Sequence, residues 1–202
     1  MKRETHMPLL EYRGKTPTIT EGAFVSPNAT LIGDVRIGKH SVIWPGSVLR
    51  AEYSPIIVGE YCTIFDGVVL FTRSDKAPIN TGNYTIIETG ATIFGCYFED
   101  FVLVSQNCLI HERSSLGEGV ILLSDSVVPP GLTIESRSIL KGDPVQKIRE
   151  QTRNDVIKHQ ERAEHFSELF MKIQHQMPHA QAYMLTFTDF MKILLDKINP
   201  TA

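Results

Sequence analysis

Large apolar residues recur at every sixth position along most of the chain, and we call these positions rungs. They are Val25, Leu31, Ile37, Ile43, Leu49, Val58, Ile64, Leu70, Ile87, Ile93, Phe98, Val104, Ile110, Leu116, Leu122, Val128, Ile134 and Leu140. A period of six matches neither the 3.6 residues of an α-helical turn nor the two-residue period of a half-buried strand. Six residues make one short strand and one turn, and stacked units of this length form a parallel β-helix.

Small or β-branched residues occupy the fourth position after most rungs, as Ala29, Ser47, Val68 and Ala91 do. Three six-residue units close one triangular coil, and successive coils lie one strand spacing, about 4.8 Å, apart. The six-residue form of this repeat coils left-handed, against the usual rule for crossover connections. The pattern therefore predicts a mainly β protein, a left-handed parallel β-helix prism of roughly six coils followed by C-terminal α-helices.

The period divides the chain into three parts. Residues 1–24 are expected to form a capping segment, and 25–145 the β-helix, interrupted by a polar loop at 72–83. Residues 146–202 are expected to form a helical tail, because apolar residues there return at helical spacing. We expect one helix over about 147–176 and a second over about 180–197, whose apolar surface should contact the prism, a neighbouring subunit or a larger partner.

The composition of the chain limits the kinds of partner that it can have. A net charge of -3 argues against a nucleic-acid partner. No apolar run reaches 18 residues, so no transmembrane helix is predicted, and the first residues show no apolar signal core. Cys62, Cys96 and Cys108 lie in or beside rungs and have no CxxC spacing, so we interpret them as small buried hydrophobic residues.

Four segments occur in the order found in the gamma-class carbonic anhydrases, which the chain resembles over about 20–150. They read GDVRIG at 33–38, SVIWPGSVLR at 41–50, VVPPG at 127–131 and LKGDPVQKIR at 140–149. The resemblance implies a homotrimer or heterotrimer of prisms. It also implies a zinc ion held between subunits by three histidines.

The three zinc-ligand positions of that family are occupied here by Phe71, Thr89 and Phe94. A phenyl ring offers zinc no lone pair, and a lone threonine hydroxyl is a poor ligand. We therefore expect no metal, no cofactor and no catalytic residue. Arg50, Glu52 and Asp66 match residues that hold the subunit seam in the family, and a structural role is expected for them.

The favoured hypothesis is a non-catalytic scaffold subunit. Chains of this family without the zinc histidines resemble carbonic-anhydrase-like subunits of the membrane arm of mitochondrial respiratory complex I, which implies homologous subunits as partners and a place on the matrix side of the inner membrane. One alternative is an acyltransferase or thioesterase with His111 as general base. Another is a homotrimer in the cytoplasm without such partners.

Overall fold

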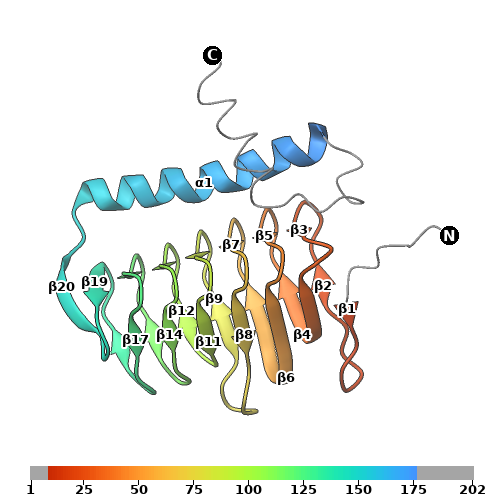
Figure 1. The fold of residues 1–202 in the computed structure, drawn as a ribbon, viewed down its shortest axis with the longest axis horizontal. Coiled ribbons are helices and arrows are strands. Elements are labelled where there is room, and N and C mark those ends of the chain that lie inside the picture. The colour runs from red at the N-terminus through yellow and green to blue at the C-terminus, as the bar shows by residue number, and fades with distance from the viewer. Residues whose placement is uncertain (1–8, 177–202) are drawn as a thin grey trace.

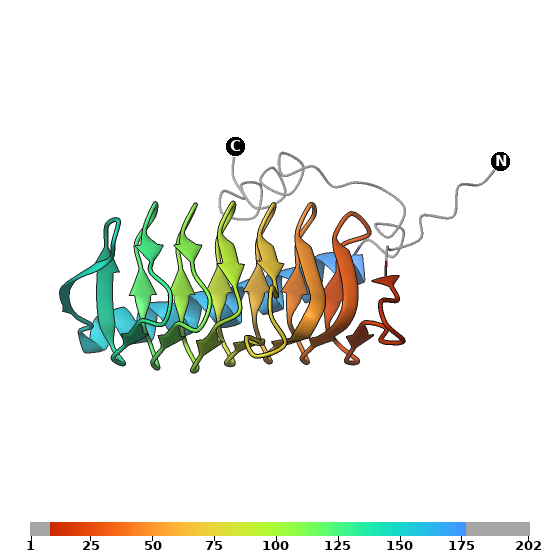
Figure 2. The ribbon, with the colours of Figure 1, turned by 90° about the horizontal axis from the view of Figure 1, so that it is seen from below.

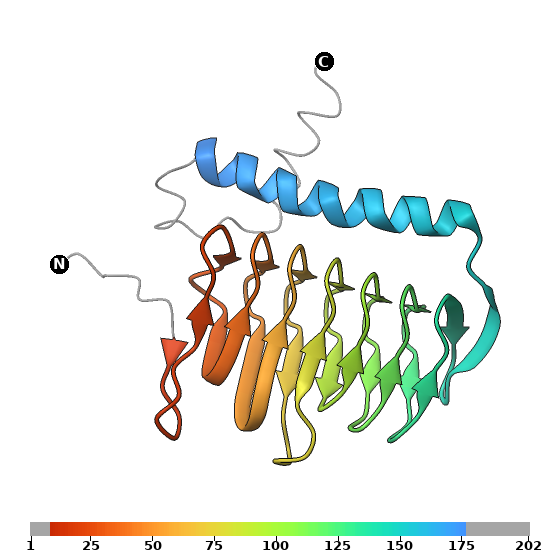
Figure 3. The same ribbon diagram turned by 180° about the vertical axis from the view of Figure 1, so that it is seen from behind.

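The computed structural model describes residues 9–176, which form a left-handed parallel β-solenoid of about seven turns followed by a helix. Figures 1 and 3 show the coils stacked side by side as a prism, with the helix running along one side of it. The predicted fold class is confirmed. The second helix predicted over 180–197 lies outside the described residues.

Face 1 of the prism consists of parallel strands and carries the candidate site. Its strands are β1 (Leu9–Leu10), the first half of β4 (Thr30–Ile37), the first half of β6 (Val48–Val58), β8 (Val69–Phe71), β11 (Thr92–Phe94), β14 (Leu109–Ile110) and β17 (Val127–Val128). Both β4 and β6 are long enough to bend round the corner and continue into the second face.

Face 2 is built in the same way. Its strands are β2 (Thr18–Ile19), the second halves of β4 and β6, β9 (Ile79–Thr81), β12 (Tyr97–Phe98), β15 (Ser115–Leu116) and β18 (Thr133–Ile134).

Face 3 forms a separate eight-stranded sheet. It contains β3 (Phe24–Val25), β5 (Val42–Ile43), β7 (Thr63–Ile64), β10 (Ile86–Ile87), β13 (Leu103–Val104), β16 (Ile121–Leu122), β19 (Ser138–Lys141) and β20 (Gln146–Glu150). All pairs are parallel except β19 with β20. Val104 pairs with Leu122, eighteen residues later, as three six-residue units per coil require.

The rungs fill the interior of the prism. Every one of them is buried, and so are the small residues Ala29, Ser47, Val68 and Ala91 that follow at the fourth position. The small side chains fit the corners, where the chain turns and the space between neighbouring strands narrows. The six-residue pattern therefore predicted the core residue by residue.

Helix α1 (Arg153–Gln176) covers face 3, and Figure 2 shows it running parallel to the long axis of the prism behind the coils. The residue before each rung on this face points outward, because side chains alternate along a strand. Val42, Ile86, Ile121 and Ile139 occupy such positions and are nevertheless buried. The helix contributes Ala163 to this contact, which is also buried.

Three segments differ in detail from the expected elements. Strands β1 and β2, within the expected capping segment, pair with β4. The expected loop at 72–83 contains β9, which extends face 2. Residues 146–150 form β20 instead of the start of a helix, because the turn at Gly142 reverses the chain onto β19, and α1 begins only at Arg153. No helix within residues 9–176 has the length and hydrophobicity of a membrane span.

Candidate functional site

Two of the three positions singled out by the missing zinc ligands, Phe71 and Phe94, lie on face 1, in a column of four outward-pointing side chains. Arg50, Phe71, Phe94 and His111 each follow a rung directly. The strand register places Arg50 beside Phe71 and Phe71 beside Phe94, and His111 follows on the next coil. We call these four residues the seam column.

The rings of the seam column contact one another and two arginines. The Phe71 and Phe94 rings meet edge to face with centroids 6.4 Å apart, and the His111 ring lies 6.1 Å from that of Phe94. The Arg50 guanidinium carbon is 4.7 Å from the Phe71 centroid, and that of Arg73 is 3.7 Å from the Phe94 centroid. Each phenyl ring thus has a cation over its face, an attractive arrangement because the ring face is electron-rich.

Arg50 is also paired with a carboxylate. Its Nε donates to Oε1 of Glu52 over 3.1 Å, and its terminal Nη2 donates to the same oxygen. The Arg50 side chain is 42% exposed and that of Glu52 is 21% exposed. In one chain this is a pair at the protein surface, which contributes little to stability. Burial of face 1 against another subunit would remove the remaining water from it.

Asp66, the third expected seam residue, lies on the corner between β7 and β8. Partial burial raises the pKa of its carboxyl. None of the ion pairs found among the described residues joins it to Arg50. The structure therefore brings Arg50 and Glu52 together and leaves Asp66 apart from them within one chain.

Thr89 lies on the next corner, between β10 and β11, and is exposed. Together with Phe71 and Phe94 it offers two phenyl rings and one hydroxyl group, which do not fit zinc. Within residues 9–176 no group of three or more His, Cys, Asp or Glu side chains could hold a metal ion. The zinc ion implied by the family resemblance therefore has no ligand set in the described part of this chain.

Arg73 is the site residue that the sequence did not indicate. It lies in the segment expected to be a surface loop, and its contact with Phe94 depends on how that segment folds back onto face 1. The three cysteines agree with their interpretation as core residues, since all are free and buried. Burial raises the pKa of the Cys62 thiol to about 11.

Comparison with known proteins gives relatives of several kinds. Residues 16–51 match the family described as bacterial transferase hexapeptide (six repeats). The carnitine operon protein CaiE of Escherichia coli K12 is 34% identical over 143 residues, which are 71% of this chain and 72% of CaiE. Gamma carbonic anhydrase 2, mitochondrial, of Arabidopsis thaliana is 28% identical over 157 residues, which are 75% of this chain and 56% of that protein.

Two solved structures superpose on about four fifths of the chain. A hexapeptide transferase family protein from Anaplasma phagocytophilum superposes with a TM-score of 0.76 at 30% identity, covering 81% of this chain and 96% of that one. A putative acetyltransferase from Bacillus cereus has a TM-score of 0.72 at 26% identity, covering 79% and 96%. With these relatives and its rung pattern, the chain belongs to the hexapeptide-repeat transferase family, and CaiE and gamma carbonic anhydrase 2 are among its relatives.

Proposed function

We propose that this protein is a non-catalytic subunit of a trimer, with face 1 as the surface that meets the neighbouring subunit. The observation that carries the proposal is the seam column, in which two phenyl rings with arginines over them stand at positions that hold zinc ligands in the gamma-class enzymes. An aromatic and arginine surface of this kind is typical of the centre of a protein interface.

The same column argues against carbon dioxide hydration. That reaction needs a metal-bound water whose pKa is lowered to about 7. Phenyl rings at two of the three ligand positions leave nothing to bind the metal, so this chain cannot supply the zinc site from its own side of a seam. What remains is the structural half of the family's site, namely the arginine and its acidic partner.

Face 1 is also one of the two faces that helix α1 leaves uncovered. Helix α1 covers face 3 from within the same chain, and the outward apolar positions of that face are buried. On face 1, the outward residues Val48, Val69, Phe71 and Leu109 are only partly buried. Hexapeptide-repeat β-helix proteins commonly form trimers, and burial of these side chains in one would supply the driving force.

The finer form of the proposal concerns the larger assembly. The sequence motifs resemble those of carbonic-anhydrase-like subunits of the membrane arm of mitochondrial complex I, and the Arabidopsis relative carries the word mitochondrial in its name. We propose that this protein acts there as an accessory subunit on the matrix side, with homologous chains as its trimer partners. The expected docking segment, residues 180–197, lies outside the described residues.

Native mass spectrometry of the protein from its source, with a stopped-flow assay of carbon dioxide hydration, tests the proposal. We expect a trimer or a larger complex that contains one, and a hydration rate equal to that of buffer with and without added zinc. A monomer, or zinc-dependent hydration, would contradict it. Deletion of residues 179–202 should leave the trimer intact and remove it from the larger complex, whereas loss of the trimer would refute the docking role.

A matched pair of substitutions tests the use of face 1. Phe94 lies on face 1, and Tyr97 lies three residues later on face 2 with 50% of its surface exposed. Phe94→Asp should convert the trimer to monomers at micromolar concentration, because three carboxylates would be buried at the seam. Tyr97→Asp should leave the trimer intact. Equal behaviour of the two variants would show that face 1 is not the interface.

A second candidate function is acyl transfer, favoured by the Bacillus cereus relative described as a putative acetyltransferase. His111 is then the general base, since it is the one imidazole of the seam column and is partly exposed. Release of free thiol from acetyl-coenzyme A in the presence of an amine acceptor would support this function. Loss of that activity in His111→Ala would assign the base, and absence of activity in the native trimer favours the scaffold.

A further inference from the structure

The corner between faces 2 and 3 contains a column of residues with left-handed backbone conformation, one in each coil. In order along the prism they are Gly22, His40, Tyr61, Tyr84, Phe101, Gly119 and Arg137, with φ between 54° and 85°. Backbone hydrogen bonds connect successive members, for example from Phe101 N to Asn83 O and from Gly119 N to Asp100 O. We call this column the corner ladder.

The aromatic side chains of the corner ladder stack on one another. The Tyr61 and Tyr84 rings lie 5.0 Å apart with an interplanar angle of 6°, and Tyr84 and Phe101 lie 4.9 Å apart at 4°. The His40 ring lies 4.8 Å from Tyr61 and is tilted by 36° against it. These separations equal the spacing of strands in the sheet, about 4.8 Å, so each coil adds one ring to a continuous stack.

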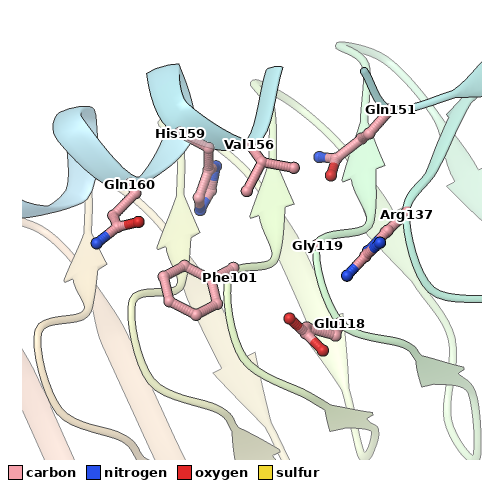
Figure 4. Close-up of a pocket in the computed structure, with 8 residues that line it drawn as sticks. All are labelled: Phe101, Glu118, Gly119, Arg137, Gln151, Val156, His159 and Gln160. Atoms are coloured by element: carbon pink, nitrogen blue, oxygen red, sulfur yellow. The ribbon is translucent and has the colours of Figure 1, made fainter. Parts of the chain in front are cut away.

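The stack stops at Gly119, which has no side chain, and resumes at Arg137, whose guanidinium is also planar. A pocket of about 110 Å³ opens at this interruption between the prism and α1. Figure 4 shows Phe101 on one side of it, Arg137 on the other, and Gln151, Val156 and His159 above. Phe101 and Arg137 are two coils apart, about 9.6 Å, which leaves space for one planar ring between them.

Three buried polar atoms of the residues that line the pocket have no hydrogen-bond partner. Both Gln151 Oε1 and Nε2 are buried without a hydrogen bond, and so is Nδ1 of His159, whose side chain is only 5% exposed. Buried polar groups are nearly always satisfied, because an unmade hydrogen bond is costly. A carboxamide with both ends free presents one donor and one acceptor side by side, which complements a ligand edge with one acceptor and one donor.

The state of His159 is fixed by its other contact. Its Nε2 lies 3.1 Å from the carbonyl oxygen of Tyr84, which can only accept, so Nε2 carries the proton and donates. Burial lowers the pKa of the imidazole, which keeps it neutral at pH 7. Nδ1 is therefore a free acceptor at the pocket, suited to a hydroxyl or amino group of a ligand.

We propose that the gap in the corner ladder at Gly119 binds a planar heterocycle with adjacent hydrogen-bond donor and acceptor atoms, as adenine has. The ring lies between Phe101 and the Arg137 guanidinium, two surfaces on which bases commonly stack. Gln151 pairs with the amino group and ring nitrogen, the bidentate geometry by which glutamine recognises adenine. The lining contains one cation, Arg137, and one anion, Glu118, so it presents no excess positive charge for a phosphate, and the uncharged nucleoside is the form to test.

Titration calorimetry of the full chain with adenosine tests this proposal, and purine riboside, which lacks the exocyclic amino group, is the matched ligand. We expect adenosine to bind about tenfold or more tightly than purine riboside, since one hydrogen bond of the bidentate pair is lost. In Gln151→Leu the two ligands should bind equally. This difference between ligands is a readout that a change in fold alone would not produce.

Gly119→Tyr supplies the missing ring from the chain itself and should abolish adenosine binding. An added Cβ would meet the flexible end of Gln151, whose Oε1 lies 2.9 Å away, and would lie in ordinary contact with Cγ of Arg137 at 3.8 Å. Gly131→Tyr is the control, because Gly131 is also left-handed but lies on another corner with no atom within 4 Å of an added Cβ. No binding of adenosine to the folded native chain, equal affinity for both ligands, or unchanged binding by Gly119→Tyr would each overturn the proposal.

Discussion

Replacement of Arg50 by alanine should weaken the association of subunits far more than the stability of one chain. In the isolated chain Arg50 contributes two things, the ion pair with Glu52 and the contact over the Phe71 ring. An exposed ion pair contributes about 0–1 kcal/mol, and an exposed cation–π contact about 0.5–1 kcal/mol. The free energy of unfolding of the monomer should therefore fall by about 1–2 kcal/mol at most.

In the proposed trimer the cost is larger, because the subunit contact would exclude water from the seam. Alanine leaves the Glu52 carboxylate without its partner, and breaking a buried pair in this way costs about 3–5 kcal/mol. Even one such site at 3 kcal/mol raises the dissociation constant of a subunit roughly a hundredfold. Arg50→Ala should therefore change the dissociation constant of the subunits much more than the midpoint of urea unfolding of the chain.

Sedimentation equilibrium over a range of protein concentrations measures the association, and urea unfolding measures the chain. Arg36→Ala is the matched control, since Arg36 pairs with Asp34 over 2.9 Å with its side chain 56% exposed, but lies on face 2. Arg36→Ala should change neither the trimer nor, beyond about 1 kcal/mol, the stability. The reasoning fails if Arg50→Ala trimerises like the native chain while unfolding at lower urea.

Three further predictions concern the interior. Burial lowers the pKa of His159, so protonation of its imidazole favours the state in which the helix is undocked. Thermal stability should therefore fall as the pH drops below about 6.5, the ordinary pKa of histidine. In thermal melts at pH 7.5 and pH 5, His159→Gln should lose less stability between the two pH values than the native chain. Ile86→Ala and Ile87→Ala should each cost about 2–5 kcal/mol, but only Ile86→Ala should speed hydrogen exchange in α1, since Ile86 lies beneath the helix and Ile87 inside the prism. The raised pKa of Cys62, about 11, and the burial of all three thiols predict no alkylation of the folded chain at pH 8 and labelling of all three in urea; rapid labelling of the folded chain would contradict the buried placement.

The core could be predicted from the sequence because each rung needs a large apolar side chain, and this requirement recurs at every sixth position many times. The same period hid a second signal. Val42, Ile86, Ile121 and Ile139 stand one position before rungs of face 3, so their pattern has the length of a whole coil. Val48, Val69 and Leu109 stand at the same position on face 1, so the pattern indicates two covered outer faces and does not say which of them α1 covers.

Other features depend on the folded coil and leave little trace in the sequence. The corner ladder is occupied by histidine, tyrosine, phenylalanine, glycine and arginine, which share a backbone conformation but no side-chain property. The contact of Arg73 with Phe94 depends on where the segment after β8 returns to face 1. Arg50 pairs with Glu52 because the two lie two residues apart on β6, whereas Asp66 lies on the corner between β7 and β8. Strand β20 depends on a chain reversal at Gly142. The sequence did not reveal this reversal, because the helical spacing of the residues downstream predicted a helix from about residue 147.

The reversal at β20 also sets the length of the molecule. A stack of parallel coils has no intrinsic end, and its last strand would be a template for further strands, as the tip of an amyloid fibril is. Here β19 is paired by an antiparallel strand whose five residues are all exposed and include Lys147, Arg149 and Glu150. The Arg149–Asp155 ion pair, at 2.7 Å, then joins this strand to the first turn of α1. On face 3, the repeat that makes the prism easy to extend is thus stopped by a short charged strand running the opposite way, which occupies the edge where another parallel strand would add.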